Sequence, residues 1–140
     1  MMTKKQAATL LFLMMVALTG LGNAQTSTII KAKVPFEFVE NGKTMPAGEC
    51  IVAVVVSNGR TVLSIGSGNQ HVYEFSDLDE SMNASGRTVL VFHQYGDRYF
   101  LAGIKRDGKT GYHLPMSRLE SELQARNAPE QAITLLASAK

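Results

Sequence analysis

Apolar and polar residues alternate along much of the chain, as they do in β-strands that bury one face. Between residues 29 and 39 every even-numbered position is apolar, and the charged side chains all lie at odd-numbered positions. Pro35 has no backbone N–H, so this strand is expected at a sheet edge or with a break. A nearly continuous β-branched run at 50–56 predicts a buried strand, and Asn58-Gly59 after it is a strong hairpin signal.

The strongest fold signal is the segment Leu90–Leu101, in which two aromatic-rich runs flank Gly96-Asp97. Glycine in the first central position supplies the positive φ of a type II′ hairpin turn. Both faces of the segment are largely apolar, so we expect a central hairpin that is covered on both sides. The cross-strand pairs that a two-residue turn predicts are Tyr95 with Arg98, His93 with Phe100, and Val91 with Ala102.

One helix is predicted near the end of the chain. Ser117 and Glu120 have the spacing of a capping box, in which the serine hydroxyl accepts from the Glu120 N–H and the Glu120 carboxylate reaches back to the Ser117 N–H. Leu119 and Leu123 lie on one helical face, which we expect to rest on a sheet. Asparagine and proline signals end the helix at about Arg126.

The remaining segments complete the expected fold. Residues 76–87 are acidic, small and polar, and predict a surface loop with at most one helical turn. Ala132–Ala137 is compatible with a strand or a second short helix, and we favour the strand. About seven strands and one late helix, with no helices between the strands, predict an antiparallel β-sandwich or a small barrel with a short C-terminal helix packed on it.

Residues 1–24 have the features of a cleavable signal peptide. Lys4 and Lys5 precede a largely apolar run of about 15 residues, and Gly22-Asn23-Ala24 gives a small-residue cleavage site. A retained anchor is the alternative, but spanning a bilayer takes roughly 20 apolar residues. We therefore expect an exported protein, periplasmic or secreted, in which residues 25–140 form a single β-rich domain.

Charge and cysteine content restrict the classes of function. Without Lys4 and Lys5, residues 25–140 carry 12 basic and 12 acidic side chains with no basic stripe. Binding to nucleic acid or to anionic lipid is therefore not expected, and no membrane association is expected after signal cleavage. Cys50 is the only cysteine, so no internal disulfide forms, and it is expected to pack as a small hydrophobe rather than to act as a nucleophile.

The chain contains no recognisable catalytic or metal-binding motif. His71, His93 and His113 are 22 and 20 residues apart and lack the close pairing of zinc ligands. The acidic residues of 76–87 lack the spacing of a calcium loop. Neither a nucleophile elbow nor a phosphate-binding loop occurs. We therefore expect a protein without cofactor, metal or enzymatic activity.

The most polar part of the central hairpin offers a candidate surface for a ligand or partner, because tyrosine and arginine are common anchors of binding surfaces. The alternative is a structural cross-strand ladder, in which Arg98 packs over Tyr95 and His93 bonds to a loop carbonyl. The candidate binding residues are His93, Tyr95, Arg98 and Tyr99.

Four sequence segments together resemble a family of short exported bacterial proteins of unassigned function that is abundant in acidobacterial genomes. The matching segments are Val34-Pro35-Phe36-Glu37-Phe38, Met45-Pro46-Ala47-Gly48, Leu90–Leu101 and Leu114-Pro115-Met116-Ser117-Arg118-Leu119-Glu120. Cys50 departs from the aromatic residue that is usual in this family, and Gln94 departs from an arginine. The resemblance implies no activity, because no catalytic motif is attached to the family.

These observations favour an exported, non-enzymatic β-domain that acts as an interaction or structural module in the cell envelope, with an envelope protein as its partner. The alternative is a carrier of a small apolar ligand, held in a barrel interior or in the groove between the helix at 117–126 and the sheet. An unfilled apolar cavity of at least ~300 Å³ would favour the carrier. A deep pocket lined by converging ionisable groups would contradict the non-enzymatic interaction module.

Overall fold

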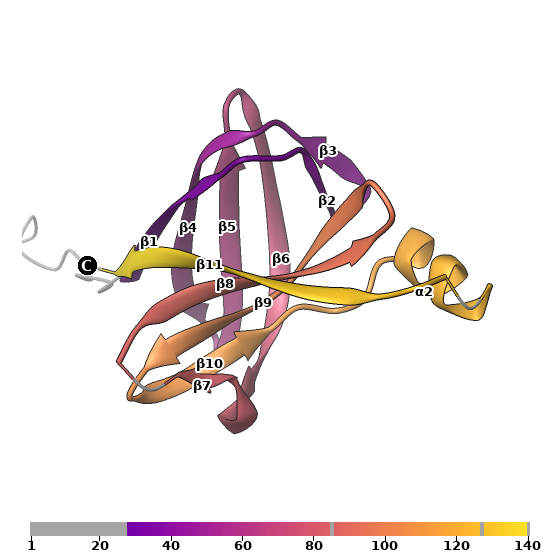
Figure 1. Ribbon diagram of the computed structural model, residues 1–140. Coiled ribbons are helices and arrows are strands. Elements are labelled where there is room, and N and C mark those ends of the chain that lie inside the picture. The colour runs from indigo at the N-terminus through magenta and orange to yellow at the C-terminus, as the bar shows by residue number, and fades with distance from the viewer. Residues whose placement is uncertain (1–27, 85, 127, 140) are drawn as a thin grey trace, which may run out of the picture.

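The computed structural model describes residues 28–84, 86–126 and 128–139 (Figure 1). The expected signal peptide at 1–24 lies outside these residues. No helix among the described residues is both long enough and apolar enough to cross a bilayer. The strands are β1 (Thr28–Val34), β2 (Phe38–Glu40), β3 (Lys43–Met45), β4 (Gly48–Ser57), β5 (Arg60–Ser67), β6 (Gln70–Asp79), β7 (Asn83–Ala84), β8 (Thr88–Tyr95), β9 (Arg98–Asp107), β10 (Lys109–His113) and β11 (Gln131–Ala139). The helices are the 3₁₀ turn η2 (Glu80–Met82) and α2 (Arg118–Ala125).

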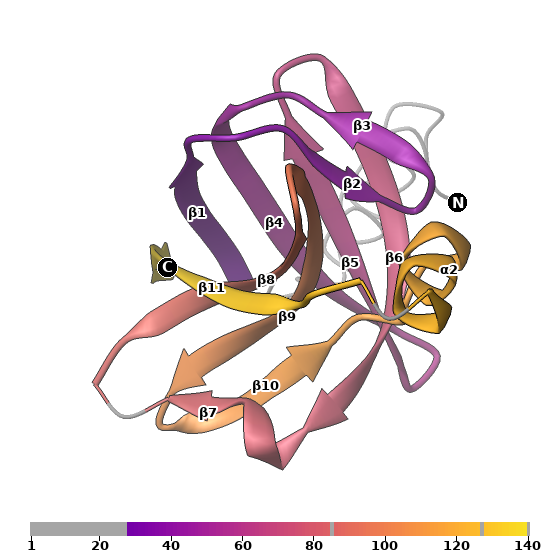
Figure 2. The same cartoon turned by 45° about the vertical axis from the view of Figure 1, so that its right-hand side comes forward.

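Eight of these strands form a closed antiparallel barrel, in the order β1-β4-β5-β6-β10-β9-β8-β11 and back to β1. The sequence left a sandwich and a barrel open, and the structure is the barrel with extra strands. β11 confirms the preferred strand for Ala132–Ala137, since it pairs with β8 on one side and with β1 on the other. Each strand of this ring pairs with a neighbour on both sides over at least part of its length, which limits edge-to-edge aggregation (Figure 2).

The central hairpin β8–β9 is confirmed, with one correction of its register. Tyr95 pairs with Arg98 and His93 with Phe100, as the two-residue turn at Gly96 predicts. Val91, however, pairs with Gly103 instead of Ala102. A β-bulge shifts the register between Val91 and Phe92, because one extra residue on β9 is left without a partner.

The strand predicted from residue 29 is broken at Pro35, as its missing N–H suggested. β1 ends at Val34, and the chain resumes as the short hairpin β2–β3, with a two-residue turn at Asn41-Gly42. The residues at 76–87, expected as a loop, are largely ordered secondary structure. β6 continues to Asp79 because Asp77 and Leu78 pair with β10, and η2 and β7 follow.

The β2–β3 hairpin fills part of the barrel wall. β10 joins β9 to β6 only along the lower part of these strands in Figure 1 and ends at His113. Above it, β2 pairs in parallel with β9 at Val39–Phe100. On the other side, Asn41 Nδ2 donates to the Tyr73 carbonyl at 3.2 Å and Lys43 Nζ donates to the His71 carbonyl at 3.4 Å, both on β6.

The barrel interior is filled by side chains. Alternate residues of each strand point inward and form one continuous apolar cluster, which includes Ile30, Val52, Ile65, Leu90 and Phe92, all 0 % exposed. The Phe92 ring packs edge-on against the rings of Phe36 and Phe38 at 5.1 and 5.3 Å. The interior therefore supplies stability by burial and leaves the wall as the place for a site.

Helix α2 confirms the predicted helix beside the barrel, although its most buried residue is not one of the predicted leucines. Ser117 caps it by accepting from the Glu120 N–H at 3.2 Å, and Arg126 is its C-cap. We expected Leu119 and Leu123 to rest on the sheet, yet both are only half-buried, and Glu120 is the buried residue of the helix. Helix periodicity identifies an apolar face, but two hydrogen bonds from the sheet hold the glutamate inside instead.

Candidate functional site

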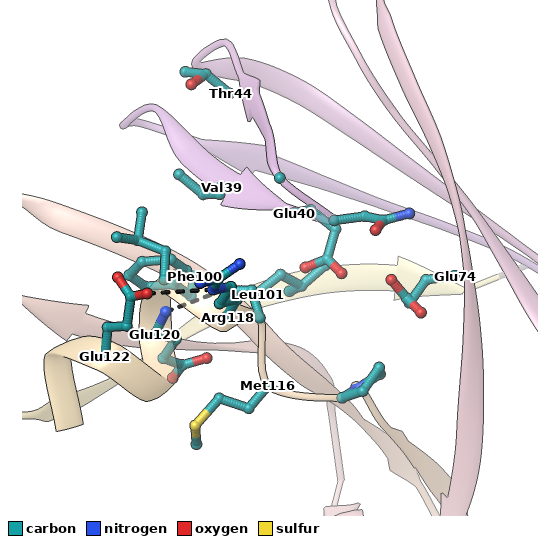
Figure 3. A pocket seen from close by; sticks show the side chains of 15 residues that line it. Val39, Glu40, Thr44, Glu74, Phe100, Leu101, Met116, Arg118, Glu120 and Glu122 are labelled. Carbon is teal, nitrogen blue, oxygen red and sulfur yellow. Dashed lines mark hydrogen bonds and ion pairs between the residues drawn. The ribbon is translucent and has the colours of Figure 1, made fainter. Parts of the chain in front are cut away.

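The main candidate site is a cleft of about 650 Å³ between the β2–β3 hairpin, β9 and the segment that leads into α2 (Figure 3). It lies where β10 has ended and the hairpin does not fill the space between β6 and β9. The apolar side chains that line it are Val39, Phe100, Leu101, Pro115, Met116 and Leu119. The charged side chains are Glu40, Glu74, Arg118, Glu120 and Glu122.

Glu40 is the most unusual residue of the cleft. Its side chain lies on the same inward-facing side of the chain as those of Phe36 and Phe38, and it is 4 % exposed. Burial, with the charges of Glu74 and Glu120 as smaller causes, raises the pKa of Glu40 to about 8. A carboxyl group with this pKa is largely protonated at neutral pH, so it is able to donate a proton or a hydrogen bond.

Two further carboxyl groups line the same cleft from other elements. Figure 3 shows Glu74 of β6 facing Glu40 across the cleft. Partial burial raises the pKa of Glu74 as well. A hydrogen bond from the Phe75 backbone lowers this pKa, but the effect of burial is larger. Glu120 comes from α2, and its carboxyl is bound by His93 and Tyr95 of β8. The cleft therefore gathers three acidic groups from three separate elements around one space.

Glu120 is held by the central hairpin. The Nδ1 atom of His93 lies 2.6 Å from Oε1 of Glu120, and the Tyr95 hydroxyl donates to the same oxygen at 3.0 Å. Burial, with the neighbouring Glu120, raises the pKa of Tyr95 to about 12, so the phenol stays a donor. His93 also lies 3.5 Å from Glu130, just before β11. These contacts fix α2 against β8 and keep the Glu120 carboxylate at the edge of the cleft.

Tyr95→Phe is expected to lower the free energy of unfolding by about 1.5 kcal/mol, because a buried hydrogen bond to a charged group is lost while the ring stays in place. Urea unfolding at pH 7 measures this change. Tyr73→Phe is the matched control, since Tyr73 is 67 % exposed on β6 and its variant should unfold like the wild type. Equal stability of the two variants would contradict the role of Tyr95.

The structure does not bring the four candidate residues together as one surface. His93 and Tyr95 converge on Glu120, while Tyr99 points to the other face and stacks on Phe36 at 3.8 Å between ring centroids. Arg98 is exposed beside the turn. The alternative cross-strand ladder is also altered, because Tyr95 packs edge-on against Phe100 and His93 bonds to a carboxylate rather than to a loop carbonyl.

The other candidate groups do not form a site in the described structure. Cys50 is 0 % exposed, and burial, with the nearby Glu40, raises the pKa of its thiol to about 12, which suits a packing role. His71, His93 and His113 lie on β6, β8 and β10. Within residues 28–84, 86–126 and 128–139, no three histidine, cysteine or acidic side chains are arranged to hold a metal ion.

Sequence reasoning missed the cleft carboxyls, although one signal was present. Glu40 occupies an even-numbered position, on the same face as Phe36 and Phe38, so a charged group interrupts an apolar face there. Glu74 likewise lies on the face of Val72, which is buried. Glu120 was assigned to a capping box, and only the fold shows that His93 and Tyr95 reach it.

Comparisons of this chain with protein-family models, with curated proteins and with solved structures found no match.

Proposed function

We propose that this protein is an exported, non-enzymatic binding domain that holds a small molecule in the cleft between the β2–β3 hairpin and α2. The observation that carries this proposal is the cleft itself, whose volume of about 650 Å³ lies within the range of ~300–1,000 Å³ that is usual for ligand sites. The groove beside the helix is one of the two places considered for a carrier, and the apolar cluster occupies the barrel interior, which was the other.

The lining of the cleft supports binding rather than catalysis. Apolar side chains from the hairpin, β9 and α2 provide area for a hydrophobic body, and a few polar groups provide orientation, which is the usual composition of a small-molecule site. The carboxyl groups have no activated nucleophile beside them, since the Cys50 thiol is buried and its pKa is raised to about 12.

Native mass spectrometry of the protein, exported by its own host and purified gently, tests the proposal. The wild type should carry a stoichiometric extra mass of a few hundred daltons. Thr44→Trp places a large ring in the cleft and should give a bare chain, whereas Thr134→Trp on the exposed side of β11 should keep the extra mass. A bare wild type, or an unchanged load in Thr44→Trp, would contradict binding in this cleft.

An interaction module is the second candidate, and a surface on the far strands favours it. The outer faces of β1, β4, β5 and β6 place apolar side chains in adjacent rows, in which Val55, Val62 and Phe75 are neighbours. Tyr73 and Phe75 are 67 % and 60 % exposed. Contiguous exposed apolar area of this kind is a common feature of protein interfaces.

Site-specific photocross-linking in the exporting host tests the second candidate. A cross-linking side chain in place of Tyr73 should yield one discrete adduct, while the same group in place of exposed Arg98 should not. Adducts at both positions, or at neither, would contradict a partner on this face. Because Tyr73 is outside the cleft, the result is independent of the binding experiment.

A further inference from the structure

The charges that line the cleft are unbalanced. Four glutamates face one arginine, and Arg118 is paired outward with Glu122 at 3.4 Å, its side chain 94 % exposed. The pair with Glu122 follows the helix surface, four residues along the same helix. It therefore leaves the carboxyl groups deeper in the cleft, those of Glu40, Glu74 and Glu120, without a cation from the lining.

Glu40 is buried, yet no other described residue bonds to its carboxyl, which is therefore free to bind what enters the cleft. Glu40 and Glu120 are similarly buried, at 4 % and 3 % exposure. Glu120 has contacts from His93 and Tyr95, but none of the hydrogen bonds or ion pairs between described residues reaches the Glu40 carboxyl. Buried polar groups in folded proteins are nearly always satisfied, because an unmet one costs about 1–3 kcal/mol. Ser76 Oγ is the fully buried side-chain atom without a partner among the described residues, so the Glu40 oxygens stay open to the cleft, where water or a bound molecule can donate to them.

The charges around Glu40 favour a positively charged molecule in the cleft. Glu74 and Glu120 raise the pKa of Glu40 beyond the effect of burial, which shows that the site has a negative potential. An anion would be repelled, and a neutral hydroxyl would satisfy one oxygen without relieving the repulsion between the carboxylates. A cation that enters the space would donate to a carboxylate oxygen and would also relieve the repulsion between the carboxylates.

The other groups near Glu40 do not replace this cation. Lys43 lies opposite Glu40 in the β2–β3 hairpin, but its ammonium group donates to the His71 carbonyl of β6. From β4, Cys50 is close enough for its thiol pKa to be raised by Glu40. From β9, the neighbours in the cleft are Phe100 and Leu101. Apolar walls next to a buried carboxyl suit a molecule that carries a hydrophobic body on its charged group.

We propose that the molecule held in the cleft is an organic amine, whose ammonium group lies against the Glu40 carboxylate and whose apolar body contacts Phe100, Leu101 and Met116. This inference rests on the proposed function and names the chemical class of its ligand. Binding involves no covalent step. The Glu40 carboxyl gives up its proton to solvent, and the resulting carboxylate accepts hydrogen bonds from the ammonium group.

The test compares two fluorescent probes that differ in one charge. Dansylcadaverine carries an apolar ring system and a free primary amine, and its N-acetyl derivative has the same body without the charge. Titrated into the protein at pH 7, the amine should bind at least tenfold more tightly than the acetylated probe. Because Glu40 must lose a proton, the affinity for the amine should rise about tenfold from pH 6 to pH 7.

Two variants connect the effect to Glu40. Glu40→Gln should remove both the preference for the amine and its pH dependence, while still binding the acetylated probe. Glu37→Gln, an exposed position three residues earlier, removes the same charge from the surface and should behave as the wild type. A preference that survives in Glu40→Gln would overturn the role assigned to Glu40.

The outcomes separate this inference from the proposed function. Equal binding of both probes by the wild type would overturn the organic amine and leave a cleft that binds small apolar molecules. Binding of neither probe would count against a ligand cleft of this size and so against both proposals. Tighter binding of the amine in the wild type alone would support both.

Discussion

Glu40→Gln is expected to make the protein more stable above pH 8, by roughly 4 kcal/mol in the free energy of unfolding. The pKa of Glu40 is about 8 in the folded chain, against an ordinary value of 4.5. An acid with a raised folded pKa contributes stability that is fully present below pH 4.5. That contribution is lost as the pH rises to about 8, because ionisation then takes place in a buried site.

Urea unfolding of ligand-free protein at pH 4.5, 7 and 9 measures this effect. The wild type should lose stability along this series relative to Glu40→Gln, and the two should be nearly equal at pH 4.5. Glu74, whose pKa is also raised, contributes to the slope in both proteins and cancels in the comparison. Glu37→Gln serves as the control and should follow the wild type. Parallel curves for wild type and Glu40→Gln would show that Glu40 ionises freely in the folded state.

Gly111→Ala is expected to destabilise the barrel by about 3 kcal/mol or more, and at 37 °C to reduce the yield of folded protein. A methyl group at Gly111 would overlap the carbonyl oxygens of Ile104 and Met82, which are backbone atoms that cannot rotate away. Gly111 lies on β10, where it pairs with Asp79 of β6, so relief of the overlap would loosen the strand that joins β6 to β9.

Gly66→Ala is the matched control for Gly111→Ala. Gly66 lies in β5, and a methyl group there would meet its nearest atoms, the carbonyl oxygens of Ile51 and Gln70, at 3.9 and 4.0 Å. This is ordinary contact, so the change in the free energy of unfolding should stay within about 1 kcal/mol. Thermal and urea unfolding compare the two variants. Similar stability of both would mean that β10 and η2 adjust without cost.

Local signals in the sequence were sufficient for most of the fold. The hairpin turns at Asn58-Gly59 and Gly96-Asp97 were read correctly because the backbone geometry of each depends on the residues in the turn itself. The break at Pro35 follows from the missing N–H in the same way. The register error at Val91 has a different origin, since the bulge lies beside Gly103 and Ile104, which also pair with β10. The hairpin sequence alone does not show that second neighbour.

The candidate site was harder to predict, because it forms between elements that are distant in the sequence. Glu40, Glu74 and Glu120 come from a hairpin, a barrel strand and a helix. Glu40 and Glu74 each interrupt an apolar strand face, but their local sequences do not show that they meet. The cleft exists because β10 stops at His113 and the hairpin covers part of the gap. The residues chosen from the sequence, His93 and Tyr95, act on this site indirectly through Glu120.

The pairing of β1 with β11 has a consequence for how the protein folds. Ile30 lies opposite Ala139, so the ring closes only when the two most distant parts of the described chain meet. Bringing together residues so far apart carries a large entropic cost, which predicts slow, late closure after the meander β4–β5–β6 and the hairpin β8–β9 have formed. A chain still missing its last strand is an open sheet with two exposed edges. Such an open sheet would pair more readily with strands of other chains than the closed ring does.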